Sequence, residues 1–540
     1  MPPFILHPGL RRPGLFGTIT LLVLSGLCQA EPGQTPELSE QTRSIEPLDL
    51  NGISAQPPRA LDPEAPFALR DPAKAMETVK LSLEEVRQAV LENQLEVRVE
   101  RLPPAMAREA LKEEEARFDL VFSGSLSQSK TESIYNEKSK YKTVTLGTTI
   151  PLRSGGSITV SVPSVRYDGT PDFHTSQVTT TFSKPLLRDG GLLVNTAGIR
   201  SAELSAQKAD AQAKLMLTNY LANADRAYWR HWAATREIDV RHEQYQLAVK
   251  QKQDAEEMLK AGLVARVEIV RSDSGIARRV EDIIVAETNR RLLERELKRI
   301  MNSAELAMNG NKALLPSVEP ELTQLFVDPE KVLSHAIQNR MELLEAQLQV
   351  AIDSLSNEVA RHQLLPLFSF EFSHSNKSWS NASLGSSLDH LSNNRYPDWS
   401  GGFSLEWPLG NHAAEARLRR SALQRAGSME SLDLRRRLIE KEVRDTVDQL
   451  EQNWLRILAA RNETRMAEAI YQAELEQFKR NQNTSTQVLD AAQFLGNAKL
   501  REISASADYQ ISKVELAFAT GSILGLTRVA IQPVFHHAPP

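Results

Sequence analysis

Few residues of this chain have the types and the spacing that enzymatic chemistry requires. His536 and His537 are adjacent near the C-terminus, where two imidazoles alone bind a metal only weakly. The other histidines of interest lie on expected helices with no second ligand at useful spacing: His231, His242 and His412. Three acidic residues lie on expected strands without the pairing that general acid–base catalysis needs: Asp119, Glu371 and Glu406. We therefore expect no catalytic residue, no metal site and no cofactor.

Motifs that bind phosphate or activate a nucleophile are also absent from the sequence. It contains no GxxxxGK, HExxH or GxSxG pattern, and Gly190-Gly191 is too short to cradle a phosphate. Arg435-Arg436-Arg437 is best explained as a solvated helix face. The balance of 64 basic to 69 acidic residues gives no signature of a nucleic-acid partner. An exported hydrolase stays open as an alternative, and it would need an acid–base pair that converges in the fold.

The composition indicates which elements could position functional residues. A mean hydropathy of −0.36 excludes a bundle of membrane-spanning helices, because each span needs about 20 apolar residues. It does not exclude a membrane β-barrel, in which only every second residue of a strand faces lipid. With 25% charged and 6% aromatic residues and a net charge of −5, the chain favours long solvated helices over a thick globular core.

The first thirty residues have the features of an export signal. Two arginines precede an apolar run over residues 15–27, and cleavage is predicted between Ala30 and Glu31. The thirteen residues of the run are too few to span a membrane. A lipoprotein signal cut before Cys28 is the alternative, although Leu27 stands where such a signal usually has a small residue.

The segment after the signal is expected to carry no packed core. Residues 31–75 are rich in Pro, Ser, Gln and acidic residues, which predicts a flexible N-terminal segment. Cys28 is the only cysteine, so the exported chain would have no disulfide and no cysteine metal site. Packing and assembly must then hold the protein together.

Residues 76–315 show the pattern of a helix, then strands, then a long helical hairpin. Ser82 and Glu85 have the spacing of a capping box at the start of the first helix. Strands with one apolar face are indicated by alternation over residues 118–126, 144–150, 158–162 and 178–182. A proline-free stretch follows, in which we expect helices over about 192–259 and 266–301.

The same plan repeats over residues 316–527. A helix starts at Val332, and alternation indicates strands over residues 368–372 and 401–407. A second proline-free stretch predicts a long helix to about Arg480 and a return helix to about Ala519. The sequence therefore predicts two copies of one plan and a C-terminal tail over 528–540.

Small sheets with one apolar face leave edges that must be paired. In a membrane this pairing is compulsory, because lipid offers no hydrogen bonds. Several copies of the chain could then close one barrel from their strands, and their long helices could form a second, helical barrel below it. A soluble β-sandwich remains the alternative for the strands. A soluble periplasmic coiled-coil adaptor or scaffold remains the alternative for the whole protein.

Four segments in the right order resemble the TolC family, the outer-membrane factors of tripartite efflux and type I secretion systems. They are LSLEEVRQAVLENQL from Leu81, KPLLRDGG from Lys184, AGLVARVEIV from Ala261 and VLDAAQFLGNAKL from Val488. The last is followed by Ala507-Asp508-Tyr509. The resemblance covers about residues 76–527.

The resemblance implies a mainly α-helical fold with a membrane β-barrel. In a homotrimer, each protomer would give four strands to a twelve-stranded barrel in the outer membrane and its lipid, and long helices to a periplasmic tunnel. The protein would be a passive exit duct and no enzyme. The implied partners are a periplasmic membrane-fusion adaptor and an inner-membrane transporter of the RND or ABC type. The cargo stays open, since drugs, metals, proteins and polysaccharides pass through similar relatives.

The resemblance also implies a constriction at the periplasmic tip. Gln487 and Asp490 fall on its acidic pair, and three copies of Asp490 would favour cations. A solvated helix residue is the alternative reading of Asp490. The latch positions of the family fall on Val267, Glu268, Phe478 and Asn483. The family's Tyr and Arg are missing at the last two positions, so Glu268 lacks its usual partner.

Adaptors of this family dock on the turns of the helical hairpins. The matching residues are Gly262, Leu263 and Val264 in the first turn and Asn481, Gln482 and Asn483 in the second. Glycine adopts positive φ freely, and asparagine is the next most tolerant residue. Plain helix–helix turns without a partner are the alternative.

Overall fold

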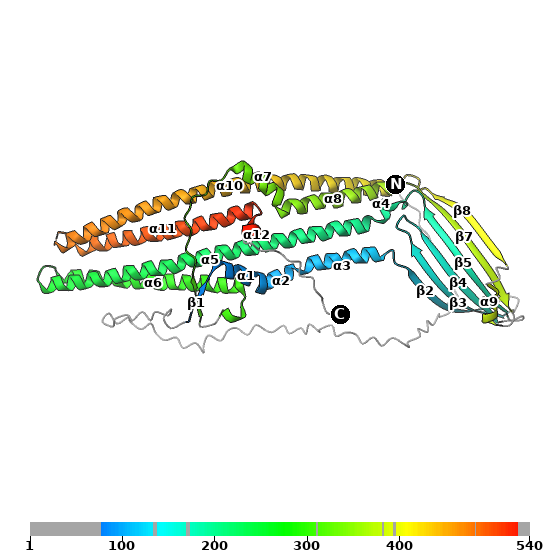
Figure 1. Ribbon diagram of the computed structural model, residues 1–540, viewed down its shortest axis with the longest axis horizontal. Coiled ribbons are helices and arrows are strands. Elements are labelled where there is room, and N and C mark those ends of the chain that lie inside the picture. The colour runs from blue at the N-terminus through cyan, green and yellow to red at the C-terminus, as the bar shows by residue number, and fades with distance from the viewer. Residues whose placement is uncertain are drawn as a thin grey trace, which may run out of the picture. The chain divides into compact units, whose positions relative to one another are not determined.

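The computed structural model describes residues 77–132, 138–168, 173–308, 312–380, 383–391, 396–480 and 482–526. The predicted export signal, the predicted N-terminal segment up to residue 75 and the predicted tail lie outside the described residues. Long helices dominate the described chain, and a sheet lies at one end of them (Figure 1). The predicted mainly helical fold with a sheet is therefore confirmed, whereas the domain boundaries stay a prediction.

Two helical hairpins make up most of the described helices. The first consists of α5 (Ala197–Lys260) and α6 (Arg266–Met301), and the second of α10 (His412–Lys479) and α11 (Ser485–Ala519). At about 1.5 Å per residue, the 64 residues of α5 and the 68 of α10 each extend roughly 100 Å. None of the four helices contains proline, so no backbone donor is missing along their length.

The first long helix begins later than predicted. α4 (Leu192–Asn195) is a single turn, and the chain leaves helical geometry at Thr196 before α5 begins. The side-chain amide of Asn195 donates to the carbonyl oxygens of Asp189 and Gly191, both at 2.8 Å. Such side-chain bonds to nearby backbone compete with a continuous helix. The expected single helix from residue 192 is therefore wrong by one turn.

Shorter helices surround the hairpins. They are α1 (Leu83–Asn93), α2 (Leu95–Glu100), α3 (Leu102–Ala116), α7 (Pro329–Asn339), α8 (Met341–His362) and α12 (Ile523–Leu526). The predicted capping box of α1 is confirmed. The Ser82 amide donates to the Glu85 carboxylate at 2.7 Å, and the Glu85 amide donates to the Ser82 hydroxyl at 3.2 Å. The bonds from Ser82 lower the pKa of Glu85.

A small parallel sheet lies beside the first hairpin, and the sequence did not predict it. β1 (Glu77–Leu81) pairs with β6 (Lys312–Pro316), far away in the chain. Leu81 and Leu314 are buried in one core cluster together with Tyr228 of α5. The Tyr228 hydroxyl donates to the Leu81 carbonyl oxygen at 3.2 Å. The sheet therefore ties the start of the described chain to the middle of α5.

The larger sheet has six antiparallel strands, in the order β2-β3-β4-β5-β7-β8. They are β2 (Val121–Glu132), β3 (Lys138–Pro151), β4 (Ser157–Asp168), β5 (Phe173–Pro185), β7 (Leu367–Ser380) and β8 (Pro397–Glu406). The expectation of four strands per protomer is therefore wrong for this sheet. The physical reason is a second hairpin in the first half of the chain, which continues the ladder of hydrogen bonds without a break.

One face of this sheet is apolar across all six strands. The register aligns Leu126 with Val144, Leu146 with Val162, and Ile158 with Phe182. It then aligns Phe182 with Phe372, and Phe370 with Phe403. Side chains two residues apart share a face, so these residues form one surface. Leu126 is 78% exposed and Phe403 is 66% exposed.

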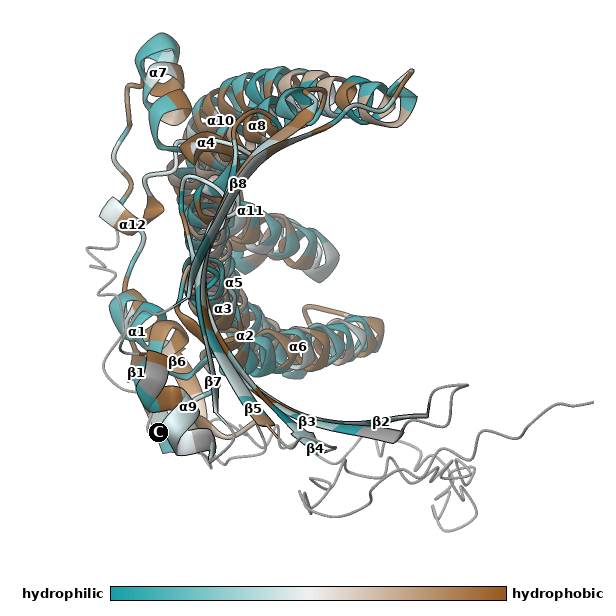
Figure 2. Cartoon of the chain, turned by 90° about the vertical axis from the view of Figure 1, so that its right-hand side faces the viewer, coloured by the Kyte–Doolittle hydropathy of each residue, from teal (hydrophilic) through white to brown (hydrophobic). Residues whose placement is uncertain are grey.

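The opposite face is rich in hydroxyls. The register brings Ser125 beside Thr145, and Thr149 beside Thr159, whose hydroxyls lie 3.3 Å apart. The sheet is curved, as Figure 2 shows. α9 (Leu384–Leu391), in the connection from β7 to β8, packs against β5 and β7. The Ser387 hydroxyl of α9 donates to that of Ser176, on the same side of the sheet as Phe182. This helix was not predicted.

Candidate functional site

The turn of the first hairpin is a helix stop that depends on Gly262. This residue has φ of +75°, which glycine adopts at no steric cost. The Gly262 amide donates to the Leu259 carbonyl oxygen, and the Leu263 amide donates to that of Met258, both at 2.9 Å. These bonds satisfy carbonyl groups that the end of α5 leaves open. Leu263 is exposed and Val264 is half-buried, so the turn presents apolar side chains at its tip.

The turn of the second hairpin is organised by side-chain hydrogen bonds. The side-chain amide of Asn483 donates to the Glu474 carboxylate and, at 2.7 Å, to the side-chain oxygen of Gln477. Thr484 and Gln487 form a capping box at the start of α11, in which the Thr484 amide donates to the Gln487 oxygen at 2.9 Å. Gln487, which we expected beside the pore, thus caps its own helix. Asn481 lies outside the described residues.

Glu268, for which no latch partner was expected, has a partner on its own helix. Arg271 donates to the Glu268 carboxylate at 2.6 Å, one turn further along α6. The second carboxylate oxygen is buried without a hydrogen-bond partner among the described residues. The neighbouring Val267 is half exposed. Glu268 and Arg271 are three residues apart, a spacing at which side chains on a helix can pair and which is visible in the sequence.

Phe478 and Asp490 have opposite surroundings. Phe478 is 3% exposed and packs with Tyr471, Val488 and Leu495 inside the second hairpin. Asp490 is exposed. Exposed residues recur along α11 at spacings of three, four or seven, which places them on one helix face: Gln487, Asp490, Phe494, Arg501 and Ser504.

α6 and α11 lie against each other near these tips. The Leu489 side chain lies close to Gly275 of α6, where an added Cβ would be 3.4 Å from it. Arg279 of α6 donates to Gln493 of α11 at 3.4 Å. The starts of both return helices, with Glu268 and Asp490, therefore belong to the same end of the molecule. Figure 2 shows α6 and α11 on the concave side of the curved assembly of elements.

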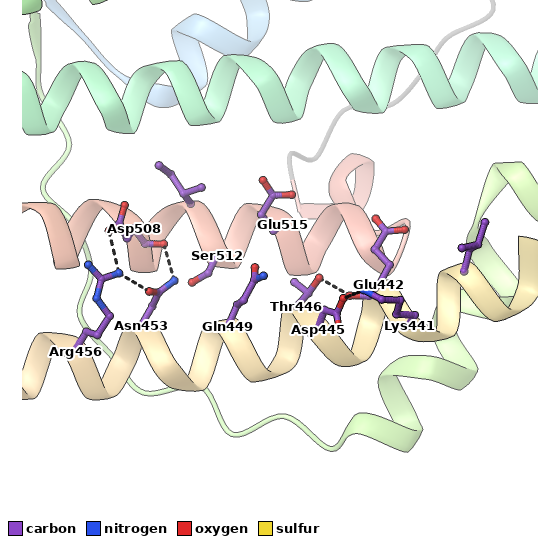
Figure 3. A pocket seen from close by; sticks show the side chains of 12 residues that line it. Lys441, Glu442, Asp445, Thr446, Gln449, Asn453, Arg456, Asp508, Ser512 and Glu515 are labelled. Carbon is purple, nitrogen blue, oxygen red and sulfur yellow. Dashed lines mark hydrogen bonds and ion pairs between the residues drawn. The ribbon is translucent and has the colours of Figure 1, made fainter.

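A polar groove of about 650 Å³ lies between α10 and α11 (Figure 3). Its lining contains acidic and basic groups, and they are already paired. Arg456 contacts Asp508 at 3.1 Å, and Lys441 contacts Asp445. Two further carboxylates of the lining bind arginines outside it: Glu442 pairs with Arg340 and Glu515 with Arg226. Carboxylates held in this way are poor general acids or bases, so the groove offers no catalytic pair.

Two buried contacts on α5 were not foreseen. His231 is fully buried, and its Nε2 donates to the Leu314 carbonyl oxygen at 3.0 Å. Burial lowers the pKa of His231, and its Nδ1 has no partner among the described residues. Asp225 accepts hydrogen bonds from Arg87 at 2.6 and 2.9 Å. Burial raises the pKa of Asp225, although Arg87 opposes the shift.

The described residues contain neither a membrane-spanning helix nor a cluster of metal ligands. No helix within them is both long and apolar enough to cross a membrane. No group of three or more potential metal ligands gathers in that part of the chain. His231, His242 and His412 accordingly belong to no such group.

The second half of the chain matches a known family. Residues 332–522 match the family described as "Outer membrane efflux protein". A comparison with curated proteins gives no match.

Solved structures with a similar fold span most of the chain. The CmeC outer membrane channel of Campylobacter jejuni is 15% identical, with a TM-score of 0.61 over 82% of this chain and 85% of that one. VceC of Vibrio cholerae is 15% identical, with a TM-score of 0.61 over 81% and 96%. The open state of the Neisseria gonorrhoeae MtrE channel is 16% identical, with a TM-score of 0.57 over 82% and 89%. At these identities the likeness establishes the fold.

Proposed function

We propose that the chain is a member of the outer membrane efflux protein family, whose model matches residues 332–522, and that it is the outer-membrane exit duct of a tripartite efflux system. It would conduct substrates passively from the periplasm to the exterior and catalyse no reaction. The observation that carries the proposal is the apolar face that continues across six strands at one end of the long helices. A soluble coiled-coil scaffold has no use for such a face, because exposed apolar surface of this extent favours aggregation in water.

The strands favour a barrel made by several copies. A sheet with two open edges cannot remain in lipid, since every backbone group must find a partner. Copies of the chain that pair edge to edge remove those edges, with the apolar face towards lipid and the hydroxyl face towards the lumen. A homotrimer is the assembly that the family resemblance suggests. The helical hairpins would then surround a periplasmic tunnel.

The partners are proposed on the same basis. A periplasmic adaptor would dock on the hairpin turns, where Gly262, Leu263 and Val264 form the described tip. The sequence predicts that Asn481 contributes to the other docking turn. An inner-membrane transporter of the RND or ABC type would supply the energy. A type I secretion system would combine the same three components and is the alternative setting for this duct.

The constriction would lie where α6 and α11 begin. Asp490 is exposed there, and three copies around one axis would attract cations into the mouth. Gln487 and Asn483 would shape the mouth through the capping and turn bonds described above, and Phe478 would act through packing because it is buried. Glu268 would be restrained by Arg271, with Val267 beside it.

Conductance of the purified protein in planar lipid bilayers tests this function. We expect discrete channel openings with a preference for cations, and we expect Asp490→Asn to reduce that preference without closing the channel. Asp433→Asn is the matched control, because Asp433 is exposed on α10, far from the tip in sequence. A protein that gives no channel events in bilayers would contradict the proposal. An unchanged selectivity in Asp490→Asn would remove Asp490 from the constriction.

A further inference from the structure

At the junction between helices and strands, the number of strands differs from the number of helices. α3, α5, α8 and α10 lie side by side in this order, as Figure 1 shows. β2 follows α3, β5 leads through α4 into α5, β7 follows α8, and β8 leads into α10. Between β2 and β5, the sheet contains two more strands, β3 and β4, joined by a turn at the helix end. Four helices therefore support six strands.

The added hairpin is a full part of the sheet. β2 pairs with β3 over twelve positions, and β3 pairs with β4 over another twelve. The alternation of faces continues through β3 and β4, so Leu146 and Val162 lie on the apolar side and Thr149 and Thr159 on the hydroxyl side. A hairpin outside the membrane sheet would not need the same two faces in the same register.

The turn from β3 to β4 is built into the junction. Gly155 and Gly156 have φ of +88° and +81°, as a tight turn requires. A Cβ on Gly156 would lie 2.0 Å from the Ser183 carbonyl oxygen, so the turn is packed against β5. The Lys184 ammonium group donates to the carbonyl oxygens of Ser154 and Gly155, at 2.7 and 3.2 Å. β5 thus holds this turn beside the start of the helices.

The width of six strands matches the width of four helices. Strands are about 4.8 Å apart, and with a tilt of about 40° each takes roughly 6 Å of a barrel's circumference. Six strands then span roughly 37 Å, and four helices at about 8–10 Å spacing span roughly 32–40 Å. Four strands would span only about 25 Å. A sheet of six strands continues the helical layer without a step.

We propose that each copy contributes all six strands, so that β8 of one copy pairs with β2 of the next. This inference rests on the proposed trimeric channel. Six strands from each of three copies make a barrel of eighteen. The closing pair is antiparallel, because β2 runs away from the helices and β8 runs back to them. Within the described residues, β2 and β8 are the two edges of the sheet.

An eighteen-stranded barrel has a wider exit than a twelve-stranded one. Barrel diameter grows about linearly with strand number, so the exit would be about one and a half times as wide. Barrels of this size leave a water-filled channel. The serine and threonine side chains of the hydroxyl face would line it. The duct would then suit bulky polar cargo, because the barrel would be no narrower than the helical tunnel.

Cysteine pairs across the proposed seam test the inference in the full-length protein. One cysteine replaces Ser123 or Ser125 on β2, and the other replaces Ser400 or Ser404 on β8. All four lie on the hydroxyl face. We expect disulfide-linked multimers up to the trimer on non-reducing gels for at least one combination. Each single variant is the control, and it should give no such bands.

A second cysteine pair and electron cryo-microscopy distinguish the proposed contact between copies from the alternative. If instead the hairpin at the sheet edge, β2 and β3, lay outside the barrel, β4 would meet β8 of the next copy, and Ser161→Cys would link to Ser400→Cys or Ser404→Cys. Electron cryo-microscopy of the detergent-extracted trimer counts the strands in cross-section. Eighteen strands support the inference. Twelve strands in a trimer, or a β4–β8 link, overturn the inference and leave the channel intact. A protein that forms no trimer overturns both.

Discussion

The ammonium group of Lys184 on β5 lies 2.7 Å from the carbonyl oxygen of Ser154, in the turn between β3 and β4. The contact ties a strand that leads into the first long helix to the hairpin that makes the sheet wider than expected.

Removal of this contact should weaken the junction. Lys184→Met leaves the Ser154 and Gly155 carbonyl oxygens without a charged donor, and such hydrogen bonds are worth about 1.5–3 kcal/mol. We expect a lower apparent Tm of the detergent-extracted protein. Lys142→Met on strand β3 of the same sheet is the matched control, because Lys142 is exposed. Equal Tm values for the two variants would show that the contact does not stabilise the junction.

The first hairpin turn should respond to the loss of its glycine. Gly262→Ala forces an L-residue into positive φ, which costs about 1–2 kcal/mol. Gly427→Ala is the control, because Gly427 lies in the interior of α10 with open space around it. That change should stabilise the helix by up to about 1 kcal/mol. Thermal unfolding followed by circular dichroism should therefore move in opposite directions. A Gly262→Ala protein as stable as the unmodified one would exclude strain at this turn.

The buried His231 predicts a dependence of stability on pH. Burial lowers its pKa below the ordinary 6.5, so the unfolded chain takes up a proton at a higher pH than the folded one. The stabilisation is complete above about pH 6.5 and is lost as the pH falls towards the folded pKa. His231→Gln keeps a donor for the Leu314 carbonyl oxygen and removes the titration. We expect a flatter curve of Tm between pH 7.5 and 5.5.

His242→Gln is the control for this titration. His242 lies on the same helix and is only partly buried. Its variant should retain the slope of the unmodified protein. If His231→Gln and the unmodified protein lost the same Tm on acidification, the slope would have to come from other groups.

The two faces of the sheet should tolerate charge differently. Phe403 and Ser404 are neighbours on β8, one on the apolar face and one on the hydroxyl face. A lysine on the lipid side of a membrane strand costs about 2–4 kcal/mol at mid-depth. Phe403→Lys should therefore reduce the protein recovered from the outer-membrane fraction, whereas Ser404→Lys should not. The reverse result would place lipid on the other face.

Local sequence patterns predicted the elements that obey local physics. The lack of proline over a long stretch and the presence of Gly262 predicted the first hairpin. The Ser82–Glu85 spacing predicted the start of α1. Alternation marked six strand segments, although the family resemblance implied four strands. The structure follows the alternation, because the pleat and the hydrogen-bond ladder are set by residues in the strands themselves.

Contacts between segments far apart in the chain could not be predicted from local sequence patterns. Arg87 and Asp225 are 138 residues apart, and His231 and Leu314 are 83 apart, so no periodicity joins them. The role of Gln487 was different. Its spacing from Thr484 is that of a capping box, and this pattern was present in the sequence but was not recognised. The constriction depends on contacts between copies and the docking residues on contacts with an adaptor, and a single chain contains neither.

The most direct test of the central claim is the native mass of the protein extracted in mild detergent from the outer-membrane fraction. The account predicts a homotrimer in that fraction, because the open edges of the apolar sheet must be paired in lipid. A monomer recovered from the soluble periplasm would contradict the channel and would favour a soluble scaffold.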